Sequence, residues 1–194
     1  MFDRLKKYCQ QAVPLLDIEL EMIDLYFEVK YLEKKEFLLQ SDQICNFIAF
    51  IAEGSIRHFH IKAGVEKTCD ISFDNSWVTD FQSFGYYTPG RMNLQAMEVT
   101  TVFFVSKDNL YKLYKACAKY ETFGRLMAER VAQRATEIAM SLSSDKPEER
   151  FQNLIEKQPD LFQPIPQKYV ANFLGISPES LSRIRKRVLQ KQKS

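Results

Sequence analysis

The sequence predicts an α+β fold, in which an antiparallel jelly roll (a double-stranded β-helix) precedes a long helix and an all-α helix-turn-helix unit. Short alternating apolar runs between turn signals occupy residues 29–105, as in β-sandwiches and barrels. A helical period then continues for more than thirty residues after Ser106. Residues 167–189 finally have the pattern of a helix, a tight turn and a second helix.

Two kinds of secondary structure are expected before the long helix. Residues 1–27 place apolar side chains at helical steps of three or four, and Pro14 interrupts them, so we expect two short helices. Candidate strands and turns alternate through residues 29–105, for example Phe47 to Ala52 and Ile56 to Ile61 on either side of Glu53-Gly54. Runs this short and closely spaced favour antiparallel pairing.

The long helix is predicted to form a dimer. Its apolar positions follow steps of three and four with one stutter: Leu110, Leu113, Cys117, Tyr120, Gly124, Met127, Val131, Ala135, Ile138 and Leu142. Because a partner helix completes such a seam, we expect a dimerisation helix at about residues 120–143, covering at least Tyr120 to Leu142. Two alternatives stay open: the helix packs on its own β domain, or the segment breaks near Ala116 to Lys119.

Cap residues after this helix predict a domain boundary near Ser143 to Lys146, which divides the chain into residues 1–144 and 145–194. The first domain has 17 basic and 19 acidic residues, a net charge of −2, and the second has 10 and 6, a net charge of +4. The total of +2 hides this asymmetry, which is typical of a chain with a terminal nucleic-acid-binding domain. A solvated basic helix would give the same counts.

The most informative segment is QKYVANFLGISPESLSRIRKRVL, residues 167–189. Gly175 ends the first helix where a left-handed residue is required, Ser177 caps the second helix, and Pro178 occupies its first position. The inward-facing positions of the second helix, spaced by three and four, are Leu181, Ile184 and Val188. The helix therefore turns a polar, basic face outward, and such a helix fits the major groove of double-stranded DNA.

The outward residues have side chains that suit nucleic acid. Arg183 can bond to guanine O6 and N7, Glu179 can accept from cytosine N4, and the serine hydroxyls can reach bases or phosphates. The lysines and Arg187 suit phosphates, which set affinity rather than sequence preference. The predicted DNA-binding residues are Lys168, Ser177, Glu179, Ser180, Ser182, Arg183, Lys186 and Arg187. A helical hairpin with a solvated face is the alternative.

The segment ANFLGISPESLSRIRKRV resembles the helix-turn-helix signature of the Crp/Fnr family of bacterial transcription regulators, and the likeness extends over essentially all 194 residues. It implies a homodimeric, sequence-specific regulator of a pseudo-palindromic DNA site, with RNA polymerase as a further partner. Glu179 and Arg183 match the family's base-reading acid and arginine, whereas Pro178 stands where many members have another arginine. The family's wing hairpin has only residues 161–166, LFQPIP, available to it, so a short wing is expected.

The resemblance also implies a sensor domain of the cyclic-nucleotide-binding type in residues 1–144. Nucleotide-binding members hold the phosphate with a Gly-Glu pair and an Arg followed by Ser or Thr, and here those places hold Thr79-Asp80 and Gly90-Arg91. The arginine is displaced by one residue, which on a strand reverses its direction. We therefore expect no cyclic AMP or cyclic GMP cofactor, and an unidentified small-molecule effector instead. The candidate effector pocket is Asp80, Phe81, Ser83, Arg91 and Asn93.

Other chemistry is not indicated by the sequence. His58 and His60 share one face of a strand, but no further ligand pattern completes a metal site. The four cysteines are too irregularly spaced for a metal knuckle or a disulfide framework. No phosphate-binding glycine loop, nucleophile elbow or acid/base pair suggests an enzyme. The alternative function is a small-molecule sensor whose C-terminal helices contact protein rather than DNA.

The hydropathy pattern predicts no membrane segment. The longest apolar stretch, Phe47 to Ala52, is far shorter than the roughly 18 residues that a membrane span needs, and the N-terminal residues lack an apolar signal core. We therefore expect a cytoplasmic protein.

Overall fold

The computed structural model describes residues 1–159 and 165–191. The chain begins with three short helices, α1 (Asp3–Ala12), α2 (Asp17–Leu20) and α3 (Met22–Tyr26). Pro14 lies between the first two, as predicted, but the second predicted helix is divided at Glu21. These helices bury Leu5, Cys9 and Ile23 against the β domain.

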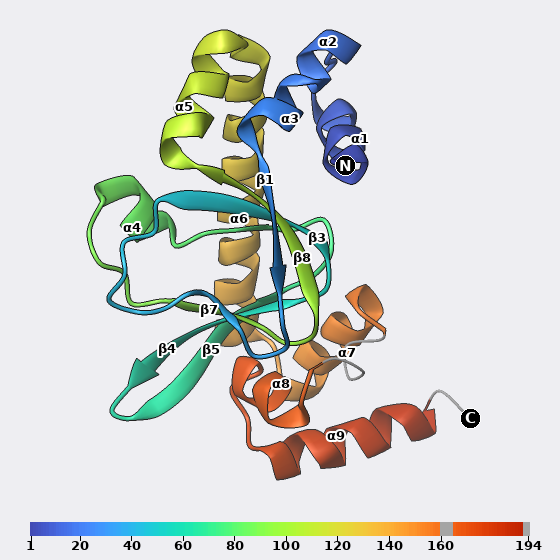
Figure 1. Cartoon of the computed structure of the whole chain (residues 1–194). Helices are drawn as coiled ribbons and strands as arrows, with labels where there is room; N and C mark the ends of the chain where they lie inside the picture. Colours follow the sequence, from blue (N-terminus) through green and yellow to red (C-terminus); the bar gives the residue numbers. More distant parts are fainter. Residues whose placement is uncertain (160–164, 192–194) are drawn as a thin grey trace.

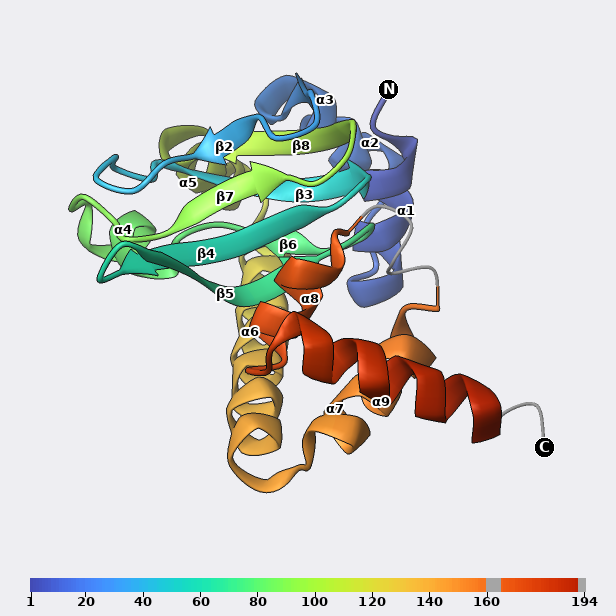
Figure 2. The same ribbon diagram turned by 90° about the horizontal axis from the view of Figure 1, so that it is seen from below.

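Strands of the described residues form two four-stranded antiparallel sheets (Figures 1 and 2). One has the order β1 (Glu28–Leu32), β8 (Thr100–Ser106), β3 (Phe47–Glu53), β6 (Trp77–Val78), and the other β2 (Phe37–Leu39), β7 (Asn93–Ala96), β4 (Ile56–Lys62), β5 (Val65–Ser72). Apart from the β4–β5 hairpin, consecutive strands alternate between the two sheets, which confirms the predicted jelly roll.

Strand alternation sorts the side chains into two cores. Ala49 and Ile51 of β3 face the other sheet, whereas Phe50 faces the N-terminal helices, because successive side chains of a strand point to opposite faces. Gly54 makes the turn from β3 to β4 with φ +104°, and a Cβ there would overlap Thr100. Only glycine combines that backbone angle with so close an approach.

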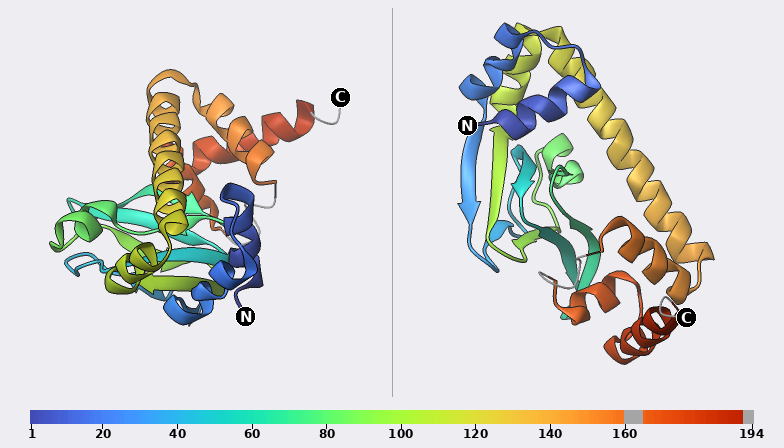
Figure 3. Two further views of the ribbon diagram at one scale, coloured as in Figure 1. Left: turned by 90° about the horizontal axis from the view of Figure 1, so that it is seen from above. Right: turned by 90° about the vertical axis from the view of Figure 1, so that its right-hand side faces the viewer.

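Two helices follow β8, namely α5 (Lys107–Ala116) and α6 (Ala118–Ser144). Cys117 between them is extended, with φ −149° and ψ 107°, so the predicted alternative of a break near Ala116 to Lys119 is correct. The first turns of α6 pack on their own domain through Tyr120, Phe123 and Met127. From residue 128 to 144 no side chain of this helix is buried, and Figure 3 shows it running past the sheets.

Three helices form the C-terminal unit: α7 (Pro147–Lys157), α8 (Gln167–Phe173) and α9 (Pro178–Lys191). Their shared core contains Phe151, Val170, Leu174, Leu181 and Ile184. Ile71 and Met97 of the β domain join this core, and α8 lies beside β5 (Figure 2). Most of the candidate wing, residues 161–164, lies outside the described residues. Within the described ranges, no helix is long and apolar enough to cross a bilayer.

Candidate functional site

The tight turn between α8 and α9 follows from a few residues. Gly175 has φ +69°, and the N–H of Ile176 donates to the Ala171 carbonyl at 3.0 Å, which closes the end of α8. The Ser177 hydroxyl accepts from the Ser180 N–H at 3.2 Å and caps α9. The second helix is therefore fixed at its first turn.

The face of α9 opposite the core is exposed, as the spacing predicts. Leu181, Ile184 and Val188 are at most 5 % exposed and face inward. The exposed predicted residues of the turn and of α9 are Ser177, Glu179, Ser182, Arg183, Lys186 and Arg187, while Ser180 is half-buried. Arg185 is exposed as well. It was not among the predicted contacts, although it belongs to the basic run RIRKR at residues 183–187.

Hydrogen bonds organise the first turns of this face. The Arg183 guanidinium donates to the Ser180 hydroxyl at 3.1 Å, which orders the arginine along the helix. Bonds from its own backbone N–H and from Ser177, with the nearby Arg183 charge, lower the pKa of the Glu179 carboxyl. Glu179 is thus an ionised acceptor beside a cation, so this turn can both accept from and donate to a partner.

Two predicted phosphate contacts already have neighbours within the chain. Arg187 forms a 3.1 Å ion pair with Glu148 of α7. Lys168 is exposed on α8, with its Nζ 4.7 Å from the centre of the Tyr169 ring. Lys186 is exposed on α9. The basic surface therefore extends over α8 and α9.

The candidate effector residues Asp80 and Ser83 are buried in a closed hydrogen-bond network. Asp80 caps α4 (Phe81–Tyr86) by accepting from the Ser83 N–H at 3.1 Å. The Ser83 hydroxyl accepts from the Cys45 N–H at 2.8 Å and donates to the Thr88 carbonyl at 2.6 Å. A Cβ at Gly90 would overlap Asp80. Asp80 and Ser83 therefore form their hydrogen bonds within the protein.

The other three candidate effector residues point to different places. Asn93 is buried and bonds to the Ser41 N–H and the Phe59 carbonyl. Arg91 is exposed, and Phe81 is 46 % exposed at the rim of two cavities. The structure thus brings Asp80 and Ser83 together but does not gather all five around one hollow.

One polar cavity of about 290 Å³ lies between the strands and α6. Arg134 of α6 binds Asp70 of β5 through two bonds of 3.0 and 2.6 Å, and this hydrogen bonding raises the pKa of Arg134. Arg130 donates to Tyr8 at 3.3 Å, and the His58 ring contacts the Ser72 hydroxyl at 3.0 Å. Sequence reasoning missed this cavity because strands and helix meet only in the fold.

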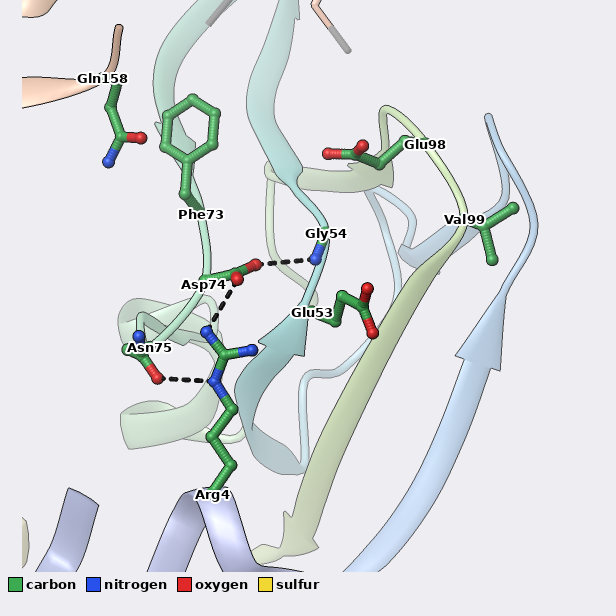
Figure 4. Close-up of a pocket in the computed structure, with 9 residues that line it drawn as sticks. All are labelled: Arg4, Glu53, Gly54, Phe73, Asp74, Asn75, Glu98, Val99 and Gln158. Atoms are coloured by element: carbon green, nitrogen blue, oxygen red, sulfur yellow. Dashed lines mark hydrogen bonds and ion pairs between the residues drawn. The ribbon is translucent and has the colours of Figure 1, made fainter. Parts of the chain in front are cut away.

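A second polar hollow lies at the turns of the β domain (Figure 4). Its volume is about 540 Å³. Arg4 from α1 reaches Asp74 at 2.7 Å and Asn75 at 3.0 Å, so it neutralises one of the acidic groups. Glu98 accepts from Ser55 at 2.6 Å. Throughout the described part of the chain, no group of three or more His, Cys, Asp or Glu side chains could hold a metal ion.

Solved structures show the same fold. FixK2 from Bradyrhizobium japonicum has 14 % identity and a TM-score of 0.74 over 86 % of each chain. A CooA variant from Carboxydothermus hydrogenoformans has 14 % identity and a TM-score of 0.66, over 94 % of this chain and 83 % of its own. A protein described as a transcriptional regulator of the Crp/Fnr family, from Eubacterium rectale, has 13 % identity and a TM-score of 0.68, over 91 % and 85 %.

No protein-family model and no curated protein sequence matches the chain. At these identities the likeness to solved structures concerns the fold. The architecture of Crp/Fnr regulators, predicted from the helix-turn-helix resemblance, is therefore confirmed at the level of fold.

Proposed function

We propose that this chain is a homodimeric transcription regulator that binds double-stranded DNA in a sequence-specific manner. The observation that carries the proposal is the exposed face of α9, where Glu179 and Arg183 project from the first turns of a helix fixed by Gly175 and Ser177. This presentation is the one by which helix-turn-helix proteins enter the major groove. The shared fold of the Crp/Fnr regulators supports the same function.

The residues of this face divide into two roles. Arg183 and Glu179 read base edges, the arginine by two bonds to guanine and the acid by accepting from cytosine. Ser177, Ser180 and Ser182 contribute hydroxyl bonds to bases or phosphates. The phosphate contacts are Lys168, Lys186 and Arg187, with Arg187 leaving Glu148 on binding.

The dimer forms through α6. Its second half buries none of its residues within the chain, although Val131, Ile138 and Leu142 continue a seam of three- and four-residue steps. A second copy of the helix would bury this seam. A two-fold dimer would place its two recognition helices about 34 Å apart, facing a pseudo-palindromic site.

The effector is not a cyclic nucleotide in this proposal. The N–H groups at a helix N-terminus are suited to a phosphate, but at α4 the buried carboxylate of Asp80 already accepts from the Ser83 N–H. A second anion there would be repelled. We further infer a cytoplasmic regulator without catalytic activity, for which RNA polymerase is a candidate partner.

Binding to fluorescent random-sequence duplex DNA tests the proposal. We expect binding at about 50 mM salt that weakens steeply toward about 200 mM, because released counterions drive it. Selecting bound duplexes from a random pool should then enrich a pseudo-palindrome. A folded dimer that does not bind at low salt would exclude DNA binding and favour the alternative, in which the C-terminal helices contact protein.

A further inference from the structure

A third cavity, lined mostly by apolar and aromatic side chains, lies on the outer face of the β1-β8-β3-β6 sheet, beneath α5 and α6. Its volume is about 210 Å³. An apolar cavity of about 150 Å³ is known to hold benzene, so this one has room for an aromatic ring with a short substituent. Ile48, Phe84, Leu113 and Tyr114 line it and do not line the polar cavity beside Arg130.

The aromatic walls hold this cavity open. The Trp77 ring centre lies 5.2 Å from that of Phe50, 5.8 Å from that of Phe123 and 6.3 Å from that of Phe27, in tilted or edge-on contacts. Tyr8 also packs edge-on against Phe123. Because these rings fix one another, the space cannot collapse by small side-chain rotations.

Three tyrosines, Tyr111, Tyr114 and Tyr120, line this cavity, and the Tyr120 hydroxyl donates to the Glu19 carbonyl at 2.8 Å. Trp77 Nε1 is buried without a hydrogen-bond partner among the described residues. Tyr114 lies over Gly124 of α6, where a Cβ would overlap its Oη atom. Burial raises the pKa of Tyr114 to about 12, so the hydroxyl keeps its proton. None of the residues that line the cavity is charged.

We propose that this cavity binds a small, uncharged aromatic molecule, with its ring beside Trp77 and a single polar group at the Tyr114 hydroxyl. The absence of charged lining residues disfavours an anion, and the Tyr114 hydroxyl gives the ligand an orientation. That the ligand is the effector rests on the proposed function. The link is α6, because Gly124, Ala128 and Val131 form one wall of the cavity and also belong to or border the dimer seam.

Trp77 is the only tryptophan of the chain and lines both this cavity and the neighbouring polar one, so its fluorescence reports binding at either, and the variants below assign the site. The full-length protein would be titrated with toluene and benzyl alcohol, and with benzoate and cyclic AMP as charged probes of similar or larger size. We expect saturable changes with the two neutral probes and none with the charged ones. No saturable change with either neutral probe, or tighter binding of a charged one, would overturn the proposal.

Two variants locate the binding. Tyr114→Phe should weaken the binding of benzyl alcohol about five- to tenfold and leave the binding of toluene unchanged, since only the alcohol can bond to the hydroxyl. Ile48→Phe should fill the cavity and weaken the binding of both probes at least about tenfold. If Ile48→Phe does not fold, Cys9→Leu fills the same cavity and replaces it. Unchanged binding in a folded filled variant would place the probes elsewhere and refute the site. Since DNA is absent from these measurements, they stand whether or not the chain binds DNA.

Discussion

The guanidinium of Arg57 stacks on the ring of Tyr169, with its Cζ 3.8 Å from the ring centre. Arg57 belongs to β4 and is fully buried, whereas Tyr169 lies on α8, the first of the two helices joined by the tight turn in the C-terminal unit. The guanidinium also donates to Thr68 at 3.0 Å and pairs with Glu66 at 2.7 Å. The burial of this cation therefore depends on α8, and the contact joins the two domains together with the bond from the Thr68 N–H to Asn172.

Tyr169→Ala should lower the free energy of unfolding by about 2 kcal/mol, because it removes a desolvated cation–π contact and leaves Arg57 without its cover. Urea unfolding followed by circular dichroism measures the loss. Tyr86→Ala is the matched control, since Tyr86 is 79 % exposed, and should change stability by less than about 0.5 kcal/mol. Equal losses in the two variants would contradict the role given to Tyr169.

Gly90→Ala should destabilise the fold by about 1–3 kcal/mol, because the new Cβ overlaps the buried Asp80 carboxylate. Gly85→Ala is the control, as nothing lies within 4 Å of its Cβ position. If the overlap with Asp80 causes the loss, Gly90→Ala should lower the free energy of unfolding much less in an Asp80→Ala background than in the wild type. Strictly additive losses in this double-mutant cycle, measured by urea unfolding, would rule out the overlap as the cause.

Local patterns predicted the helices and strands well because their causes are local. Gly175, Ser177 and Pro178 act within one turn of the chain, and the three-and-four spacing of α6 depends only on the helix itself. The break at Cys117 was left open because no glycine or proline marks it. It becomes visible in the structure, where the extended backbone of Cys117 separates α5 from α6 and both helices contribute side chains to one apolar core.

Contacts between distant segments could not be predicted in the same way. The position of Ser83 depends on the Cys45 N–H, and the cover of Arg57 depends on α8, so neither has a sequence pattern nearby. An arginine in an alternating strand would ordinarily be expected on the solvent side. For the same reason the cavities, whose walls come from several elements, were not anticipated.

Stability should fall in mild acid because of His58. Burial lowers the pKa of this ring below its usual value of about 6.5, although the nearby Asp70 charge acts in the opposite direction. The unfolded chain then binds a proton that the folded chain does not, so stability is complete above about pH 6.5 and decreases as the pH falls through that value. His58→Gln should reduce the difference in urea midpoint between about pH 7.5 and 5.5. An unchanged difference would assign the acid sensitivity to other groups.

Arg183→Ala should abolish most of the preference for the selected DNA site, by about 1–3 kcal/mol, while binding to random duplexes survives. The reason is that Arg183 stands in the first turns of α9, where side chains reach base edges. Lys186→Ala is the comparison. It should weaken the binding of specific and random DNA alike, and it should reduce the slope of log K against log salt concentration by about one. Anisotropy titrations against both DNAs distinguish the roles, and uniform weakening by Arg183→Ala would make that residue a phosphate contact.

The dimer seam gives the last prediction. Ile138→Asp should convert the protein to a monomer, because it places a charge at a half-buried seam position in the half of α6 that fully buries none of its side chains within its own chain. Met140→Asp introduces the same charge on the same helix, at a side chain 63 % exposed and off the seam, and should leave the dimer intact. Sedimentation velocity measures both. Because a monomer has one recognition helix, Ile138→Asp should also lose the cooperative binding of two half-sites while its circular dichroism spectrum stays folded. A dimeric Ile138→Asp variant would show that the two copies meet elsewhere.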